Sequence, residues 1–234
     1  MVRASLYLLF VFPWTFLCSI IALLSTFIER SGRTYHKVAL FWSKVSLLTA
    51  GVKVEVAGSE LIPRDQPIIF MGNHQSNFDI LALFQAIPIR FNWLAKEELF
   101  KIPLFGRSMQ SAGYIPINRG DGRDSLKSID RAAQLVRGGT SIVIFPEGTR
   151  SNDGNLLPFK RGGFVLAAKA GVPIIPFSIS GSMKVNPPDN IFCILPGVIR
   201  IKFSPPVRTT LNGAKQQISI MDQVRTAIVS GLES

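Results

Sequence analysis

The pattern of hydrophobic positions changes near residue 50 and divides the chain into two parts. Residues 5–28 are almost wholly apolar and carry no charged side chain, and about 20 such residues suffice to cross a bilayer. The stretch is longer than the apolar part of a signal peptide, and no small-x-small cleavage site follows it, which favours a retained anchor. Residues 34–50 place apolar side chains at helical spacing, which predicts an amphipathic helix at the membrane interface or under the next domain.

The rest of the chain alternates between strand-like and helix-like patterns. Period-two alternation or continuous apolar runs predict strands at 52–56, 68–71, 141–145 and 174–179. Helical periodicity predicts helices at 123–137, 162–170 and 218–228. This order predicts an α/β fold in residues 51–234, with a mostly parallel central sheet flanked by helices. A membrane-associated pair of helices in residues 1–50 precedes it.

The charge of the chain indicates an anionic partner. The sequence has 26 Lys and Arg against 15 Asp and Glu, a net charge of +11. Beside an apolar anchor, this charge favours lipid headgroups and a phosphorylated substrate over nucleic acid. More basic residues follow the anchor than precede it, which places the domain on the cytoplasmic side if the segment crosses the membrane. A hairpin that dips into one leaflet fits the same sequence.

The few cysteines and histidines limit the possible chemistry. Cys18 and Cys193 lie in separate apolar segments and predict neither a disulfide framework nor a metal site. Of the two histidines, His36 is expected on the surface of the 34–50 helix near headgroups, without a catalytic role. Imidazole chemistry is therefore expected at His74.

A histidine and an aspartate lie on the predicted turn between the strand at 68–71 and a helix. On a regular helix, side chains at the spacing of His74 and Asp79 would point about 140° apart, so they meet only if the turn folds back. A neutral imidazole can act as a base near neutral pH, and a carboxylate fixes its tautomer and stabilises the imidazolium. The alternative is that both residues merely cap the turn and the helix.

Two further polar clusters follow apolar strands. Arg119 ends one of them, and Glu147 and Arg150 lie in the other. Ligands of open α/β sheets bind at the carboxyl ends of the strands, and arginine makes paired hydrogen bonds to phosphate. Together with His74, these residues predict one site for a hydroxyl compound that bears a phosphate. Taken alone, each arginine is better explained as a solvated strand end or a surface ion pair.

Four segments resemble, in order, the signature blocks of the glycerolipid acyltransferase family: 73–79, 113–119, 145–151 and 172–177. Residues 96–106 are similar to the segment between the first two blocks in bacterial 1-acylglycerol-3-phosphate acyltransferases. The apolar helix pair resembles the membrane-docking element of the bacterial members. The resemblance covers roughly residues 50 to 210.

The resemblance implies transfer of a fatty acyl group from acyl-CoA or acyl carrier protein to the sn-2 hydroxyl of lysophosphatidic acid. The product is phosphatidic acid, an intermediate of phospholipid biosynthesis. In that reaction His74 takes the hydroxyl proton, Asp79 holds the ring, and the alkoxide attacks the thioester directly. The lack of a G-x-S-x-G elbow agrees with a reaction without an acyl-enzyme. No cofactor beyond the acyl co-substrate is expected, and the expected location is the bacterial inner membrane, with the catalytic domain on its cytoplasmic side.

The resemblance also assigns substrate binding to Lys96, Arg119, Glu147, Gly148, Thr149 and Arg150. Both arginines would hold the acceptor phosphate, and the Gly-Thr pair would supply backbone and hydroxyl donors. The glutamate would orient an arginine or bond a glycerol hydroxyl, and the lysine would add positive potential.

Several alternatives stay open. The acceptor could instead be glycerol 3-phosphate, another lysophospholipid or a lyso-aminolipid, because the base chemistry is shared. A membrane-bound thioesterase or other hydrolase, and a non-catalytic lipid-binding module, are the readings from other classes. The acyl-chain length, the donor carrier and the oligomeric state are not determined by the sequence.

Overall fold

The computed structural model describes residues 2–29, 31–117, 122–209 and 214–232. A seven-stranded sheet runs through it in the order β1-β7-β6-β2-β5-β3-β4. Neighbouring strands pair in parallel except β6 and β7, which are antiparallel. The mostly parallel α/β sheet predicted from the sequence is confirmed. The strands are β1 Val52–Ala57, β2 Ile69–Gly72, β3 Phe91–Lys96, β4 Ile115–Ile117, β5 Ser141–Ile144, β6 Ile174–Ser180 and β7 Gly197–Phe203.

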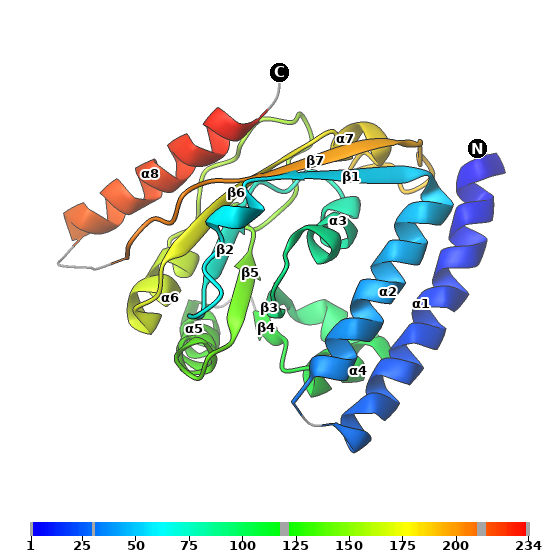
Figure 1. Cartoon of the computed structure of the whole chain (residues 1–234), viewed down its shortest axis with the longest axis horizontal. Coiled ribbons are helices and arrows are strands. Elements are labelled where there is room, and N and C mark those ends of the chain that lie inside the picture. Colours follow the sequence, from blue (N-terminus) through cyan, green and yellow to red (C-terminus); the bar gives the residue numbers. More distant parts are fainter. Residues whose placement is uncertain (1, 30, 118–121, 210–213, 233–234) are drawn as a thin grey trace.

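Helices cover both faces of the sheet (Figure 1). One face carries α1 Val2–Ile28, α2 Arg33–Ala50, α3 Phe78–Ala86 and α4 Phe105–Ser111. The other carries α5 Gly122–Arg137, α6 Gly162–Ala170 and α8 Ala214–Gly231. The short helix α7 Ser182–Val185 packs beside β7, and Ser59–Leu61 and Glu97–Lys101 form 3-10 turns.

Two hydrophobic clusters, one on each face, explain why the central strands read as continuous apolar runs. In β2, Phe70 belongs to the cluster under α1 to α4, whereas Ile69 and Met71 belong to the cluster under α5, α6 and α8. Every residue of β2 and β5 is buried. A strand covered on both faces has no solvent side, so polar alternation disappears.

The N-terminal helices lie side by side and run in opposite directions (Figure 1). Both predicted helical ranges are confirmed, and α1 continues through Pro13 without a break. Among the described residues, α1 is the one helix that is long and apolar enough to cross a membrane. Its inner side, including Tyr7 and Ala22, belongs to the same hydrophobic cluster as the sheet. Its outer side exposes large apolar side chains such as Phe16 and Phe27.

His36 was expected on the exposed surface of α2 but lies half-buried between α2 and the sheet. Its ring centroid lies 5.9 Å from that of Phe84 and 5.3 Å from that of Phe91. Burial and the nearby Arg90 guanidinium lower the pKa of His36 to about 4. The residue is therefore a neutral packing group.

Candidate active site

His74 and Asp79 are brought together by the turn between β2 and α3. The Nδ1 atom of His74 lies 2.8 Å from Oδ2 of Asp79. The same oxygen accepts the backbone N–H groups of Gln75 at 2.7 Å and Ser76 at 2.9 Å, and Asp79 is completely buried. An ionised carboxylate can only accept, so Nδ1 carries the proton and Nε2 is left as the basic nitrogen. The turn folds back, which is the condition for the two side chains to meet.

The start of this turn is fixed to the neighbouring strand. The side chain of Asn73 donates to the carbonyl of Ile179 at 2.8 Å and accepts from its N–H at 2.7 Å. A Cβ atom at Gly72 would lie 2.1 Å from the ring of Phe177, so only glycine fits there. The first residues of the turn therefore cannot slide along β6.

The segment after β5 holds the other side of His74. The ring of Phe145 stacks on the imidazole with centroids 3.9 Å apart and planes 6° apart. Glu147 accepts the N–H of His74 at 2.8 Å, and the N–H of Ser151 donates to the carbonyl of His74 at 2.8 Å. Backbone and ring of the histidine are thus both located by this segment.

Glu147 is placed differently from the expectation that it orients an arginine or bonds a glycerol hydroxyl. Its second oxygen accepts the N–H of Leu157 at 2.7 Å, so both oxygens bind backbone groups, and only 2% of its surface is exposed. Burial raises the pKa of this carboxyl, against the lowering effect of the two backbone donors. In this structure Glu147 positions His74 and the chain around Leu157.

Four more of the residues expected to bind substrate meet His74 at one cavity of about 780 Å³. Lys96, Gly148, Thr149 and Arg150 all line it. Arg150 donates to the side-chain oxygen of Asn77 at 2.7 Å, which holds the guanidinium beside the turn of His74 and Asp79. Gly148 has a φ of +76°, and a Cβ there would lie 2.9 Å from the Lys160 side chain. Arg119 lies outside the described residues.

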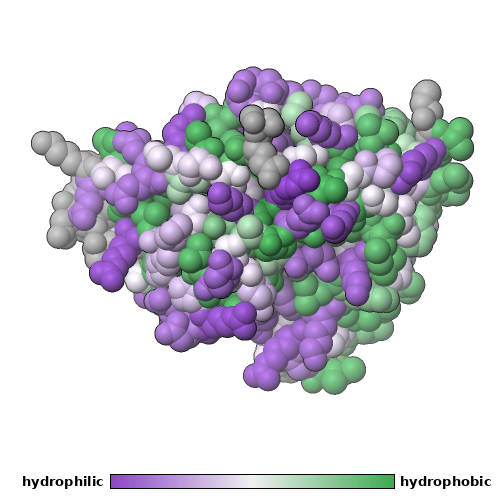
Figure 2. All heavy atoms as spheres, turned by 45° about the horizontal axis from the view of Figure 1, so that its top comes forward, coloured by the Kyte–Doolittle hydropathy of each residue, from purple (hydrophilic) through white to green (hydrophobic). Residues whose placement is uncertain are grey.

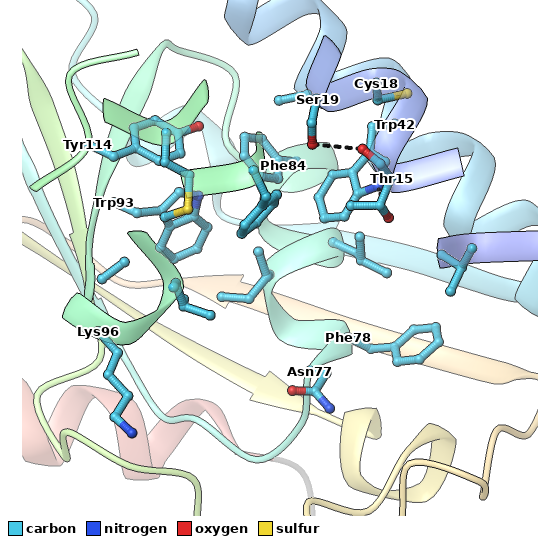
Figure 3. A pocket seen from close by; sticks show the side chains of 18 of the residues that line it. Thr15, Cys18, Ser19, Trp42, Asn77, Phe78, Phe84, Trp93, Lys96 and Tyr114 are labelled. Atoms are coloured by element: carbon cyan, nitrogen blue, oxygen red, sulfur yellow. Dashed lines mark hydrogen bonds between the residues drawn. The ribbon is translucent and has the colours of Figure 1, made fainter. Parts of the chain in front are cut away.

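The cavity runs along the inner face of α1 into the domain (Figure 3). Its lining on α1 extends from Tyr7 to Ala22, about 22 Å at the rise of an α-helix. Lys96 and Asn77 lie at one end in Figure 3, whereas Tyr114 and Ser19 lie far from them. Among the described lining residues, cationic side chains occur only in Lys96 and Arg150, with neutral groups along the deeper part.

The deep part contains buried hydroxyl and indole groups. Burial raises the pKa of Tyr35 to about 12, so its hydroxyl stays protonated. Trp93 Nε1 and Tyr114 Oη have no hydrogen-bond partner among the described residues. The space beyond His74 is therefore uncharged and mostly apolar, as a cavity for a long hydrocarbon chain would be.

Comparison with known proteins identifies the family. The family model described as Acyltransferase matches residues 53–180, and the chain belongs to this family. It is 33% identical over 206 residues to the chloroplastic 1-acyl-sn-glycerol-3-phosphate acyltransferase BAT2 of Brassica napus, covering 87% of this chain. A Borreliella burgdorferi protein of the same activity name is 38% identical over 136 residues, covering 58% of this chain and 54% of that protein.

The similarity to solved structures includes the N-terminal helices. The crystal structure of the 1-acyl-sn-glycerophosphate acyltransferase PlsC from Thermotoga maritima matches with a TM-score of 0.78 and 25% identity. The match covers 97% of this chain and 95% of that one. Among the curated relatives, this chain spans 58% of the Brassica protein and 54% of the Arabidopsis thaliana protein LPAT1, somewhat more than half their length.

Proposed function

We propose that this protein transfers a fatty acyl group from a thioester donor, acyl-CoA or acyl carrier protein, to the sn-2 hydroxyl of 1-acylglycerol 3-phosphate. The observation that carries the proposal is the His74–Asp79 pair, which leaves Nε2 of His74 as a base at the cationic end of a long apolar cavity. The names of the relatives support the same reaction. The product is phosphatidic acid.

The chemistry needs one proton carrier and no covalent enzyme intermediate. Nε2 of His74 takes the proton of the acceptor hydroxyl while the oxygen attacks the thioester carbonyl carbon. The carbon–sulfur bond then breaks, and the leaving thiolate takes the proton from the imidazolium. Asp79 stabilises the imidazolium between these steps, and its complete burial makes this interaction strong.

The apolar cavity is assigned to the acyl chain of the donor. The thioester carbonyl must reach His74, which lines the cavity together with Phe84 and Trp93. The lining of the cavity on α1 spans about 22 Å, more than half the thickness of a bilayer hydrocarbon core, which is about 15 Å and corresponds to roughly one lipid chain. A chain of membrane-lipid length therefore fits.

The acceptor phosphate is assigned to the cationic rim. Arg150 offers a fork of N–H donors, and Lys96 and the segment of Gly148 and Thr149 border the same space. Arg119 remains part of this proposal from its place in the sequence. Glu147 is proposed as a positioning residue for His74.

The proposed location is the cytoplasmic face of a bacterial inner membrane. The basic residues that follow α1, including Lys37 and Lys44, support this side because the anionic headgroups of the cytoplasmic leaflet attract them. Because the inner face of α1 packs on the domain and its outer face is apolar and exposed, the structure favours a helix lying in one leaflet over one that crosses.

An acceptor panel tests the proposal. Purified protein in vesicles is given acyl-CoA or, separately, acyl carrier protein thioester, with lysophosphatidic acid, glycerol 3-phosphate, lysophosphatidylcholine or no acceptor. The proposal expects thiol release that requires lysophosphatidic acid. Equal release without an acceptor would identify a thioesterase, and preference for another acceptor would overturn the assignment of the substrate.

A further inference from the structure

Residues 187–195, called here the 187–195 loop, hold apolar side chains out of the protein between α7 and β7. Ile191, Phe192 and Leu195 are 50%, 57% and 51% exposed. The loop is ordered by hydrogen bonds: the side chain of Asn186 donates to the carbonyls of Asn190 and Cys193, both at 3.0 Å. The exposed apolar side chains therefore belong to a turn whose backbone is held by hydrogen bonds.

The loop also borders the substrate cavity. Ile191 and Ile194 line this cavity, and Ile194 is buried in the same cluster as the inner side of α1. Phe12 of α1 is 67% exposed and lines the cavity as well. Because Phe12 and Ile191 are exposed to solvent and also line the cavity, both lie at an opening of the cavity.

The apolar surface of α1 continues toward this loop. Pro196, directly after the loop, and Arg3 near the start of α1 both lie against Gly51, where an added Cβ would meet them at 3.3 and 2.7 Å. Figure 2 shows apolar side chains gathered on the side of the molecule that α1 forms. Asp189 is the only charged residue of the loop, and the exposed Lys184 precedes it. An apolar surface with basic neighbours at the mouth of an apolar cavity fits the interface of a lipid bilayer.

We propose that the 187–195 loop inserts into the lipid bilayer and forms, with α1, a second membrane contact at the mouth of the cavity. The partner that the loop contacts is the acyl region of the membrane, because the loop presents apolar side chains both toward the cavity and toward the outside of the protein. Acyl chains passing between bilayer and cavity then meet apolar side chains throughout. The part about acyl chains rests on the proposed function; the membrane contact itself does not.

Asn186, directly before the loop, ties it to the turn of His74 and Asp79. Ser76 Oγ donates to the carbonyl of Asn186 at 2.8 Å, and the side chain of Asn77 donates to that of Asn186 at 3.4 Å. Asn77 in turn accepts from Arg150. Insertion of the loop therefore sets the depth of His74 and of the phosphate-binding rim relative to the membrane surface.

The test compares Phe192→Glu with Val229→Glu. Val229 is 51% exposed on α8, which covers the opposite face of the sheet. Both variants and the unchanged protein are floated with vesicles of phosphatidylethanolamine and phosphatidylglycerol. Because α1 remains as an anchor, removing one apolar side chain and adding a charge should lower the vesicle partition coefficient of Phe192→Glu about tenfold, measured over a series of lipid concentrations, with that of Val229→Glu unchanged. Equal binding of both variants would overturn the proposal.

A fluorescence measurement covers the case in which Phe192→Glu does not fold. Phe192→Trp and Val229→Trp share the same native tryptophans, so the difference between them reports the introduced residue. Vesicles should shift the emission of Trp at position 192 to shorter wavelength and leave that at position 229 unchanged. An unshifted spectrum at 192 would contradict insertion.

Activity assays separate this proposal from the proposed function. Phe192→Glu should lose turnover on lysophosphatidic acid in vesicles but keep it on acceptor dispersed in detergent. An equal loss in detergent would mean that the loop acts on the site itself and not through the membrane. Absence of turnover in the unchanged protein would contradict the enzyme assignment, while the flotation result would still decide the membrane contact.

Discussion

At the scale of single residues, the imidazole of His74 is held from several independent directions. Asp79 fixes the tautomer, Phe145 fixes the plane of the ring, and Glu147 and Ser151 fix the backbone. A general base works only if its nitrogen lies within hydrogen-bond reach of the proton it takes. Changes to the residues that hold His74 are therefore expected to lower kcat, whereas changes to the residues that bind substrate are expected to raise KM.

Asp79→Asn removes the charge proposed to stabilise the imidazolium and keeps the size of the side chain. We expect kcat to fall about 10²- to 10⁴-fold, with little change in the KM for lysophosphatidic acid. Asp65→Asn, at an exposed position, is the matched control and should have normal kinetics. A full kcat in Asp79→Asn would exclude the proposed role of the carboxylate.

Glu147→Gln places an amide group against one of two backbone N–H donors. The mismatch should lower stability by about 1 to 3 kcal/mol and lower kcat by displacing His74, while the KM for lysophosphatidic acid stays the same. Steady-state kinetics and thermal unfolding measure both effects, with Glu60→Gln at an exposed position as control. A raised KM with normal kcat would instead support the substrate contact expected from the sequence.

Arg150→Ala removes the proposed charge-assisted contact to the acceptor phosphate. Such contacts contribute about 1.5 to 3 kcal/mol, so the KM for lysophosphatidic acid should rise about 10- to 100-fold while vesicle binding is kept. Arg64→Ala, at an exposed position, controls for the loss of net charge. An unchanged dependence of rate on lysophosphatidic acid would remove Arg150 from the phosphate site.

At the scale of elements, the sequence predicted the strands and helices whose apolar pattern is set locally. The helix at 162–170 and the strands at 52–56 and 68–71 match α6, β1 and β2 closely. β3 and β7 are absent from the predicted elements, although Ile199, Arg200 and Ile201 show the buried–exposed alternation of a strand. Polar and charged residues interrupt the apolar run of each strand, whereas pairing with neighbours far apart in sequence defines both strands in the structure.

The same limit applies to the site. The contact of His74 with Asp79 was predictable because both lie on one short turn. The stacking of Phe145 and the backbone role of Glu147 depend on how β5 pairs with β2, which no local pattern encodes. The cavity is formed between α1, α2 and the sheet, and hydropathy alone reads α1 as an isolated membrane helix.

His36 gives the packing of α2 on the sheet a pH dependence. Its pKa of about 4 in the folded protein lies below the ordinary value near 6.5, so the folded state binds fewer protons than the unfolded state between these values. Stability is full above pH 6.5 and falls as the pH drops toward 4. Because the side chain is only half-buried, we expect a loss of about 1 to 2 kcal/mol.

Denaturant unfolding at several pH values checks this dependence. His36→Phe keeps an aromatic ring against Phe84 and Phe91 and should remove the His36 share of the slope between pH 6.5 and 4. The same slope in the variant and in the unchanged protein would show that His36 is not responsible.

Ala22 tests the assignment of the cavity to the donor chain. Ala22 is 5% exposed, and it lines the cavity far from Tyr7. Ala22→Phe should shift the preferred acyl-CoA to shorter chains without lowering kcat for short ones. Ala57→Phe, at an exposed position outside the cavity, is the control, and an unchanged chain-length profile in Ala22→Phe would refute the assignment.

At the scale of the whole molecule, the apolar surface of α1 and the candidate base His74 border the same cavity, and the chain carries a net positive charge. The exposed face of α1 borders the cavity, and the net charge of +11 favours an anionic membrane and a phosphorylated acceptor. His74 and Arg150 line the same cavity as α1. An acceptor that keeps its own chain in the bilayer can therefore present its headgroup to the site without leaving the membrane.

The central claim, base-catalysed acyl transfer by His74, is tested most directly by phosphatidic acid formation in the unchanged protein and in His74→Ala. Both are assayed with acyl-CoA and lysophosphatidic acid in vesicles, and free thiol is measured in parallel. The account predicts one thiol released for each phosphatidic acid formed, and in His74→Ala a loss of turnover of at least about 10³-fold with unchanged folding and vesicle binding. Turnover retained by His74→Ala would contradict it.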